Sequence, residues 1–582
     1  MRRTQTAPSD GAWRRCLCAL LVLVAGVVAY HNSLGGPFLF DDQFRIIENA
    51  RIRHLWPLST LLAGSLRPVV DLSLAINYAL GGLDVRGYHL VNLAIHLSAA
   101  LCLFGIVRRT LSLPRMSARL GDAALWLSTC VAILWVVHPL QTQSVTYTIQ
   151  RAESLAGLWH LLTLYSVIRG EGSRRASGWH ALAVLACALG MATKPVMVTA
   201  PLLVLLYDRT FLSGSVGEAL RRSRGLYAGL AATWLVLGVV LASPELAQLS
   251  AGFHLRTRTP LEYAGSQPGV ILHYLRLAFW PHPLVFDYDW PVAHGAAIAR
   301  PAFLVGVALL AAGWMLRRAP AVGFLGAAFC LLLAPSSSVI PIRDLAMEHR
   351  MYLPLAPLMI LAVIGAHAGL RRRPSSPALR RAIGAVLMVA ITIACARLTI
   401  RRNADYASEE AMWQDTVQKR PANPRAHTNL GAVLAAQGRI DDAIAHYQET
   451  LRLDDAYAEA HSNLAAALAG RGRLAEAGAH YQTALQLWPD DAKAHVGLGV
   501  VLSTQGRRSE AMRHYQDALR LDPQSAEAHN NLGVALVEEG QVDEAIAHYL
   551  DALRLRPDYA KARNNLEEAR ALRRSHLSVE PH

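Results

Sequence analysis

The chain has 582 residues, of which 53% are hydrophobic and 17% charged, and its mean hydropathy is +0.24. This composition excludes a disordered chain and an ordinary soluble one, because long apolar runs fill the first two thirds of the sequence. The net charge of +14 divides unevenly: up to Arg402 there are 38 Lys and Arg against 17 Asp and Glu, and from Asn403 onward 19 against 26. The basic excess therefore lies in short loops between apolar runs, where it orients a membrane protein, and no nucleic-acid partner is expected.

Apolar runs up to residue 402 predict a multi-pass membrane domain. Eleven are long enough, or nearly so, to cross the ~30 Å of hydrocarbon in a bilayer as helices. A further run, 269–280, contains His273 and Arg276, and we interpret it as an interfacial or re-entrant helix of about a dozen residues. The first run is short enough for a cleaved signal peptide, but we expect an uncleaved span. The eleven runs are 16–30, 88–107, 123–137, 154–168, 179–192, 196–207, 226–243, 301–316, 321–334, 352–370 and 382–399.

Arginine clusters fall in alternate gaps between these runs. Because cytoplasmic loops carry the excess of Arg and Lys, all six clusters and the N-terminus are predicted to lie on the cytoplasmic side of the plasma (inner) membrane. An odd number of spans then places the C-terminal domain outside the cytoplasm. Arg397, Arg401 and Arg402 depart from this scheme, because they would lie just outside. The six clusters are Arg2, Arg3, Arg14 and Arg15; Arg108, Arg109, Arg115 and Arg119; Arg169, Arg174 and Arg175; Arg209, Arg221, Arg222 and Arg224; Arg317 and Arg318; and Arg371, Arg372, Arg373, Arg380 and Arg381.

The C-terminal third repeats every 34 residues, which is the period of tetratricopeptide (TPR) helix pairs. We therefore predict an all-α chain with a polytopic transmembrane domain of about 11 spans over 1–402, followed by a TPR solenoid. The solenoid comprises a half-repeat linker over 403–423, four repeats over 424–559, and a capping helix with a tail over 560–582. The recurring residues include Leu430, Leu464, Leu498, Leu532 and Leu566, with Tyr447, Tyr481, Tyr515 and Tyr549.

Histidines and asparagines recur at fixed positions of the repeats, and each set is a candidate for ligand binding. Equivalent histidines are 34 residues apart on successive repeats, too distant to share an ion, so no metal site and no cofactor are predicted. The asparagine before the repeat leucine offers a donor and an acceptor, and a ladder of such amides on the concave face can hold an acceptor peptide. Alternatively, the asparagine occurs at this position only because it suits the packing of the first helix of each repeat. The ladder consists of Asn429, Asn463, Asn531 and Asn565, with Gly497 as the exception.

Charged residues outside the arginine clusters gather on the side predicted to be non-cytoplasmic. Charges near the membrane are costly and indicate function by default. The first outer loop holds Asp41 and Asp42, and a later hairpin holds Lys194, the only lysine before residue 402. Carboxylates suit proton transfer, and cations suit an anionic group. The other candidates are Arg151 and Glu153 at the end of HPLQTQSVTYTIQRAE, and Arg343, Glu348, His349 and Arg350 in IRDLAMEHRMYLP.

Several motifs occur in an order that resembles a known family. They are RPVVDLSLAINYALGGL, GYHLVNLAIHLSAAL, HPLQTQSVTYTIQRAE, TKP, FDYDWP, EHRMYLP and the TPR entry WQDTVQKRPANPRAHTNLGAVL. Together they resemble the transmembrane-and-TPR-containing (TMTC-type) O-mannosyltransferases and their bacterial relatives. These are membrane glycosyltransferases of the GT-C fold, akin to protein O-mannosyltransferases. The resemblance covers nearly the whole chain, with departures at Thr-Lys-Pro, where Ser-Lys-Glu is expected, and at His349.

The resemblance implies transfer of a sugar, expected to be mannose, from a polyprenyl-phosphate carrier to Ser or Thr hydroxyls of an exported protein. An acidic residue of the first outer loop, Asp41 or Asp42, would take the acceptor proton, with Glu153 as a further catalytic candidate. Cations would hold the phosphate as it leaves. The predicted donor-phosphate site comprises Arg151, Lys194, Arg343, Glu348, His349 and Arg350.

Each assignment also has an alternative. The whole protein could be a non-catalytic, membrane-anchored TPR scaffold, or an oligosaccharide ligase or polymerase that uses a polyprenyl diphosphate. The charged motifs could be structural, and two histidines of one predicted span are expected to be buried hydrogen-bonders. These structural alternatives are ion pairs Arg151–Glu153 and Glu348–Arg350, a helix cap at Asp41–Asp42, and buried His89 and His96.

Overall fold

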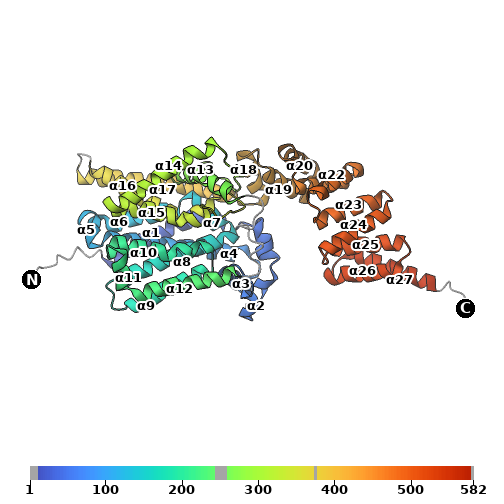
Figure 1. Cartoon of the computed structure of the whole chain (residues 1–582), viewed down its shortest axis with the longest axis horizontal. Coiled ribbons are helices and arrows are strands. Elements are labelled where there is room, and N and C mark those ends of the chain that lie inside the picture. Colours follow the sequence, from blue (N-terminus) through green and yellow to red (C-terminus); the bar gives the residue numbers. More distant parts are fainter. Residues whose placement is uncertain (1–10, 243–258, 373–375, 578–582) are drawn as a thin grey trace, which may run out of the picture. The chain divides into compact units, whose positions relative to one another are not determined.

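The computed structural model describes residues 11–242, 259–372 and 376–577. Helices form almost all of the regular structure there, and these ranges contain no β-strand, so the all-α prediction is confirmed. The chain divides into two compact units, Met1–Met412 and Trp413–His582 (Figure 1). The predicted membrane domain lies within the first unit, and the boundary falls inside α18 (Glu409–Lys419), in the predicted linker.

The first unit is a bundle of helices joined by loops that contain shorter helices. The bundle core is apolar and is built around α4, α6, α8 and α10. The helices are α1 (Ala12–Tyr30), α2 (Leu58–Leu62), α3 (Pro68–Gly81), α4 (Val85–Leu111), α5 (Pro114–Leu120), α6 (Ala124–Val136), α7 (Thr142–Thr146), α8 (Arg151–Gly170), α9 (Ala176–Met191), α10 (Ala200–Tyr207), α11 (Val216–Arg222), α12 (Arg224–Leu241), α13 (Pro260–Phe279), α14 (Ala296–Arg318), α15 (Pro320–Leu333), α16 (Leu355–Arg371) and α17 (Pro377–Ala404).

All eleven predicted spans fall on helices to within a few residues at their ends, and residue 243 of the run 226–243 lies outside the described residues. Among the described residues, seven helical segments are long and apolar enough to cross a membrane. They contain α1, α4, α6, α10, α12, α14 and α17. The shorter apolar helices α9, α15 and α16 and the more polar α8 account for the other four predicted spans. Several membrane-type helices are thus present, and the number of crossings stays a prediction.

Apart from its last residue, Trp280, which is the C-cap, the stretch 269–280 belongs to α13, which has 20 residues. The predicted length of about a dozen was wrong, because Thr259 and Glu262 form a capping box that starts the helix well before the apolar run. Pro268 lies inside this helix. The interfacial or re-entrant position of this helix stays a prediction.

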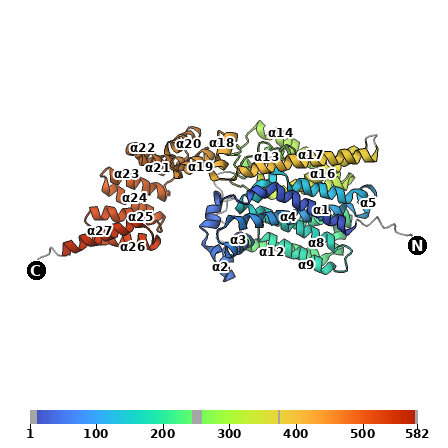
Figure 2. The same ribbon diagram turned by 180° about the vertical axis from the view of Figure 1, so that it is seen from behind.

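Three long apolar helices of the first unit expose most of their side chains. α14 has no buried residue, and its exposed side chains include Phe303, Leu310 and Trp314. α17 buries 6% and α1 17% of their most apolar windows. α1 and α17 pack beside each other (Figure 2). Apolar surfaces this large are better suited to contact with lipid than with water. A helix can lie in lipid because its backbone hydrogen bonds are all made within the helix.

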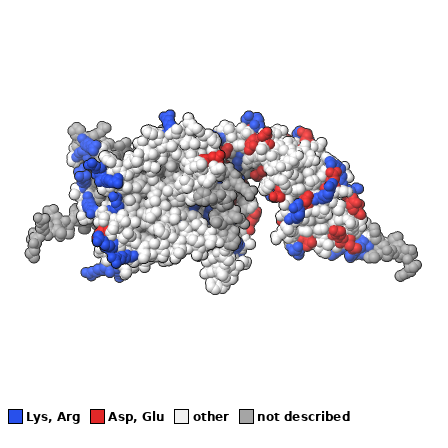
Figure 3. Space-filling view, viewed as in Figure 1, with Lys and Arg blue, Asp and Glu red and all other residues white. Residues whose placement is uncertain are grey.

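Basic side chains gather at one end of the first unit (Figure 3). Contacts between separate clusters support this, since Arg371 donates to the carbonyl of Arg119 (2.8 Å) and Arg222 pairs with Glu171 (3.1 Å). These contacts join the cluster of Arg371 to that of Arg119, and the cluster of Arg222 to the loop between Arg169 and Arg174. That all six clusters share one side of a membrane stays a prediction. Of the predicted cluster members, Arg2, Arg3 and Arg373 lie outside the described residues.

The second unit is a stack of helix pairs, as the 34-residue period predicts. The helices are α19 (Pro424–Ala436), α20 (Ile440–Leu453), α21 (Ala458–Gly470), α22 (Leu474–Leu487), α23 (Ala492–Thr504), α24 (Arg508–Leu521), α25 (Ala526–Glu538), α26 (Val542–Leu555) and α27 (Ala560–Leu577). In three repeats a glycine of the first helix lies under the ring of the repeat tyrosine. A Cβ at Gly431, Gly499 or Gly533 would come within 2.6 Å of that ring.

The second repeat explains why the asparagine ladder is interrupted. It has Ala465 where the other repeats have that glycine. The ring of Tyr481 lies instead against Gly497, where an added Cβ would be 2.2 Å from the tyrosine Cζ. Gly497 occupies the ladder position of the third repeat, so the displaced tyrosine takes the space that an asparagine side chain would need.

Gly497→Ala is expected to destabilise α22 and α23 by about 1–3 kcal/mol, the usual cost of overpacking. Hydrogen–deuterium exchange of the full-length protein should show faster exchange confined to these helices. Adding Ala465→Gly should restore protection, because it reopens the position that the other tyrosines use. Gly470→Ala is the matched control, since no atom lies within 4 Å of its added Cβ. Equal exchange in the two alanine variants would contradict this packing account.

Candidate active site

The loop after α1 presents two aspartates from a strained turn. Phe40 has a φ of +42°, which bulky residues rarely adopt and which often marks functional sites. Asp42 is fully buried, and its carboxylate oxygens accept hydrogen bonds from the backbone N–H groups of Leu39 (3.0 Å) and Ile149 (2.8 Å). Burial raises the pKa of Asp42 to about 7. Asp42 therefore joins this turn by hydrogen bonds to the loop that precedes α8.

Asp41 has a different environment from Asp42. Its backbone N–H donates to the Tyr147 hydroxyl (2.9 Å), and its side chain is exposed. Surrounding atoms still displace enough water to raise the pKa of the Asp41 carboxyl, although the Tyr147 hydroxyl and the charges of Arg45 and Arg67 oppose the rise. Of the two aspartates, Asp41 has the carboxylate that an incoming hydroxyl can reach, and Asp42 has the structural contacts.

The positive charges of three residues act on the imidazole of His349. Burial lowers the pKa of His349 well below its ordinary value, and the charges of Lys194, Arg350 and Arg67 lower it further. Lys194 forms an ion pair with Glu153. We call Arg67, Glu153, Lys194, His349 and Arg350 the charged cluster. With three cations and one carboxylate, it carries a net positive charge of the kind that binds phosphate.

The Arg350 guanidinium is held by neutral acceptors. It donates to the carbonyls of Leu345 (2.9 Å) and Asp344 (2.5 Å) and, more weakly, to the Ser336 carbonyl and the Tyr263 hydroxyl (both 3.4 Å). Within the described ranges no carboxylate forms an ion pair with Arg350. These contacts fix the orientation of the side chain without neutralising its charge.

Arg67 is a member of the cluster that the sequence analysis did not name as a site residue. It lies directly before α3, and its guanidinium makes no hydrogen bond and no ion pair with any described residue. Burial lowers the pKa of Arg67, the neighbouring Arg45 lowers it further, and Asp71 and Glu153 raise it. A signal was available in the sequence, because SLRPVVDLS lies in the same predicted outer loop as Asp41.

Arg151 does not face the charged cluster. It is fully buried, and its guanidinium donates to the Asn92 side chain (2.6 Å) and to the carbonyls of Tyr88 (3.0 Å) and Ser73 (3.2 Å). It therefore joins α3, α4 and α8. The alternative of an Arg151–Glu153 ion pair was wrong, since residues two apart on a helix point in different directions and Glu153 pairs with Lys194.

Glu348 is also a structural residue. It is fully buried and accepts hydrogen bonds from the backbone N–H of Val285 (2.5 Å) and the hydroxyl of Tyr288 (3.0 Å). Its ion pair is with Arg402 (3.5 Å), so the alternative of a Glu348–Arg350 pair was wrong. Arg402 also pairs with Asp405 (2.9 Å). Arg402 departs from the predicted arginine clusters because it lies on the non-cytoplasmic side in that scheme, and these two ion pairs give it a structural reason to be there.

Glu348→Gln is expected to lower the free energy of unfolding by roughly 3 kcal/mol, because it leaves part of a buried ion pair uncompensated. Thermal unfolding of the detergent-solubilised protein measures the effect. Asp122→Asn, at an exposed position, is the control and should leave the transition unchanged. Equal transitions for Glu348→Gln and wild type would contradict a structural role for Glu348.

The remaining predicted site residues are dispersed. Arg343 is exposed and makes no hydrogen bond or ion pair with a described residue. His89 bonds to the Gly36 carbonyl (2.9 Å), and His96 bonds to the Tyr352 hydroxyl and the Val136 carbonyl (both 3.0 Å). Both histidines are buried, so their prediction as hydrogen-bonders is confirmed.

The asparagine ladder is half-buried throughout. Asn429 donates to the Arg425 carbonyl (2.9 Å), and Asn565 donates to the Asn530 side chain (2.9 Å). Asn531 accepts from Asn530 (3.1 Å). Each amide keeps donor or acceptor capacity beyond these bonds. The role of the ladder in acceptor binding stays a prediction.

Comparison with known proteins places this site in context. TPR family models match residues 433–472, 456–524 and 496–560. The chain is 24% identical over 542 residues to protein O-mannosyl-transferase Tmtc3 of Drosophila melanogaster, covering 76% of this chain and 56% of the relative. It is 25% identical over 506 residues to TMTC4 of Mus musculus, covering 74% of this chain and 65% of the relative. The resemblance to the TMTC family is confirmed.

These two TMTC matches cover about three quarters of the chain, and solved TPR structures match a smaller share. The TPR protein YrrB, described as having an unusual peptide-binding site, is 22% identical and covers 28% of this chain and 84% of its own, with a TM-score of 0.25. The chain spans about half the length of most of the TMTC relatives it matches, within a range of 19% to 65%. The activity of this TMTC-like chain is therefore a proposal.

Proposed function

We propose that this TMTC-like chain is a membrane mannosyltransferase that moves mannose from a polyprenyl phosphate to Ser or Thr hydroxyls of exported proteins on the non-cytoplasmic face. The observation that carries the proposal is the charged cluster, in which Arg67 and Arg350 have no carboxylate partner, beside the exposed carboxylate of Asp41. The names of the relatives, protein O-mannosyl-transferases, support the sugar and the acceptor class.

The geometry suits a single displacement at the sugar C1. The acceptor oxygen forms a bond to C1 as the bond from C1 to the carrier phosphate breaks. Asp41 takes the hydroxyl proton, which a carboxylate does best when its pKa is raised towards the working pH. Arg67, Lys194 and Arg350 stabilise the charge that develops on the departing phosphate. Asp42 keeps Asp41 in place through its two backbone hydrogen bonds.

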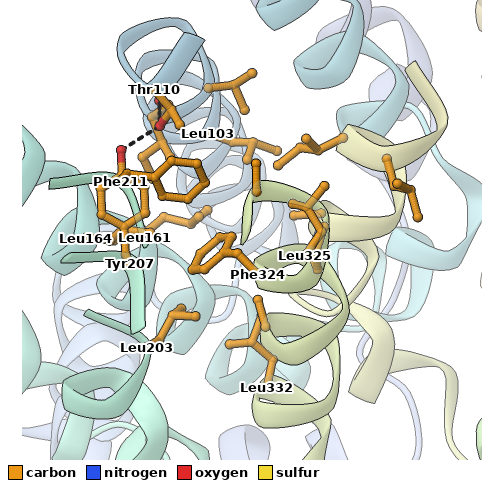
Figure 4. A pocket seen from close by; sticks show the side chains of 18 of the residues that line it. Leu103, Thr110, Leu161, Leu164, Leu203, Tyr207, Phe211, Phe324, Leu325 and Leu332 are labelled. Carbon is orange, nitrogen blue, oxygen red and sulfur yellow. Dashed lines mark hydrogen bonds between the residues drawn. The ribbon is translucent and has the colours of Figure 1, made fainter. Parts of the chain in front are cut away.

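An apolar pocket inside the first unit supports a polyprenyl carrier (Figure 4). Its volume is about 180 Å³, and α4, α8, α10, α15 and α16 line it. The pocket wall includes Leu353, three residues after Arg350. It also includes Leu332, four residues before Ser336, whose carbonyl accepts from Arg350. The pocket therefore reaches the segments that contain and contact Arg350. An apolar cavity of roughly 150 Å³ holds a benzene-sized group, so this pocket suits about one isoprenoid unit.

The membrane orientation is part of the proposal. Basic side chains gather at one end of the first unit, and the charged cluster is formed at helix ends that alternate with the arginine clusters along the chain. The positive-inside rule supports an orientation in which the charged cluster and the TPR unit are on the non-cytoplasmic face of the plasma membrane. The TPR unit would bind the acceptor, with the asparagine ladder contacting its backbone.

The test is sugar transfer by the full-length protein reconstituted in liposomes. The donors are labelled polyprenyl-phosphate mannose and polyprenyl-phosphate glucose, and the acceptor is a Ser/Thr-rich secreted protein. We expect label on the protein from the mannose donor. Label from glucose alone would overturn the choice of sugar. Label on a lipid-linked glycan instead of protein would favour an oligosaccharide ligase, and no transfer from any donor would favour a scaffold.

A further inference from the structure

Each TPR repeat of the second unit contains a pair of touching histidines. The two imidazoles come from the first and second helix of one repeat and are 19 residues apart, whereas the sequence argument compared histidines 34 apart. Their Nδ1 atoms are 2.9–3.0 Å apart in all four repeats. The pairs are His427–His446, His461–His480, His495–His514 and His529–His548.

The first histidine of each pair is oriented by the backbone. The Nε2 atom of His495 bonds to the Pro489 carbonyl (3.1 Å), and that of His529 to the Pro523 carbonyl (3.4 Å). A carbonyl can only accept, so Nε2 carries the proton and Nδ1 has its lone pair directed at the partner histidine. Metal-binding histidines are commonly fixed in this way, by donating the other ring N–H to a backbone carbonyl.

A carboxylate completes the group in the third and fourth repeats alone. Asp517 lies beside His495 and His514, and Asp551 beside His529 and His548, with one ligand atom from each residue within 4.8 Å of the others. In each aspartate Oδ1 accepts from an arginine (2.9 Å from Arg520 to Asp517), and Oδ2 has no hydrogen bond with a described residue.

The first two repeats lack an available carboxylate at this position. The first has Glu449, both of whose oxygens accept from Arg452 (2.6 and 2.7 Å). The second has Thr483, whose hydroxyl donates to the Ala479 carbonyl (3.1 Å). The four repeats, all of which are described, therefore contain two complete groups and two incomplete ones at equivalent positions.

We propose that the third and fourth repeats each bind a divalent transition-metal ion such as Zn²⁺ through two histidine Nδ1 atoms and one aspartate. The ligand types suit zinc, and a solvent molecule can take the fourth position. Ligand atoms on a tetrahedral ion with bonds near 2 Å lie about 3.3 Å apart. The histidine nitrogens need to separate by a few tenths of an ångström, and the aspartate must approach by a small rotation. Binding requires His514 or His548 to carry its proton on Nε2, and it joins the two helices of the repeat.

The test measures zinc bound to the full-length protein in nanodiscs by equilibrium dialysis against low-micromolar Zn²⁺, followed by mass-spectrometric metal analysis. We expect two ions per chain in the wild type. The double variant Asp517→Asn with Asp551→Asn should lose both, because an amide is a much weaker zinc ligand than a carboxylate. Thr483→Asp should raise the number to three by completing the second repeat.

Co²⁺ gives an independent readout, since a tetrahedral site with nitrogen ligands produces visible absorption bands. We expect these bands in the wild type, their loss in the double variant and an increase in Thr483→Asp. Zinc binding that the double variant retains would overturn the proposal, as would the absence of binding in the wild type. Because none of these residues belongs to the charged cluster, sugar transfer by the variants tests the proposed function separately.

Discussion

Asp41→Asn is expected to lower the rate of mannose transfer by roughly 10²–10⁴-fold, which is the contribution of a positioned general base. The amide keeps the size of the side chain and removes its ability to take a proton. Binding of the polyprenyl-phosphate donor should be unchanged, because Asp41 is not a ligand of the phosphate in this mechanism. Transfer assays in liposomes and donor-binding assays on the same preparations separate the two effects.

The pH profile provides a second criterion for Asp41. The base must be ionised, so the rate falls about tenfold per pH unit below its pKa. Because the pKa of Asp41 is raised, the decline should begin at a higher pH than for an ordinary aspartate. The residual rate of Asp41→Asn should lack this decline. Glu48→Gln, an exposed acid of the same loop, is the control. Equal rates in Asp41→Asn and Glu48→Gln would exclude Asp41 as the base.

Arg67→Gln is expected to lower kcat/KM by roughly 10²–10³-fold, the cost of removing one group that stabilises developing charge. The protein should remain as stable as the wild type, since this guanidinium makes no hydrogen bond or ion pair with a described residue. Removing its charge should also raise the pKa of Asp41 further, because Arg67 lowers that pKa. The decline in rate at low pH should therefore begin at a higher pH than in the wild type.

Two other arginines serve as matched controls for Arg67. Arg343→Gln changes an exposed arginine in the loop before Arg350 and should leave both rate and stability unchanged. Arg151→Gln should instead reduce the yield of folded protein, because it leaves the carbonyls of Tyr88 and Ser73 buried without a donor. If Arg343→Gln lowered the rate as much as Arg67→Gln, the charged cluster would be assigned to the wrong arginine.

The sequence predicted the ion-pair partners of the candidate site residues poorly. Motif order and charge alternation predicted that Asp41, Glu153, Lys194 and Arg350 lie on one side of the membrane, and this stays a prediction. The partners of the charges were assigned by proximity in the sequence, and this was wrong for Glu153 and for Glu348. Glu153 pairs with Lys194 across 41 residues, and Glu348 with Arg402 across 54 residues. Spacing of two residues on a helix argues against contact, so the error could have been avoided.

The sequence by itself determined the two architectures of this protein. Hydrocarbon demands long apolar helices, and a solenoid needs each repeat to pack on the next, so both leave regular patterns in the chain. Only the tertiary structure decided which aspartate is anchored, that Arg67 lacks a partner, and that two histidines of one repeat touch. These facts depend on contacts between segments far apart in the sequence, because a side chain's burial and partners are set by whatever packs against it, which no local pattern records.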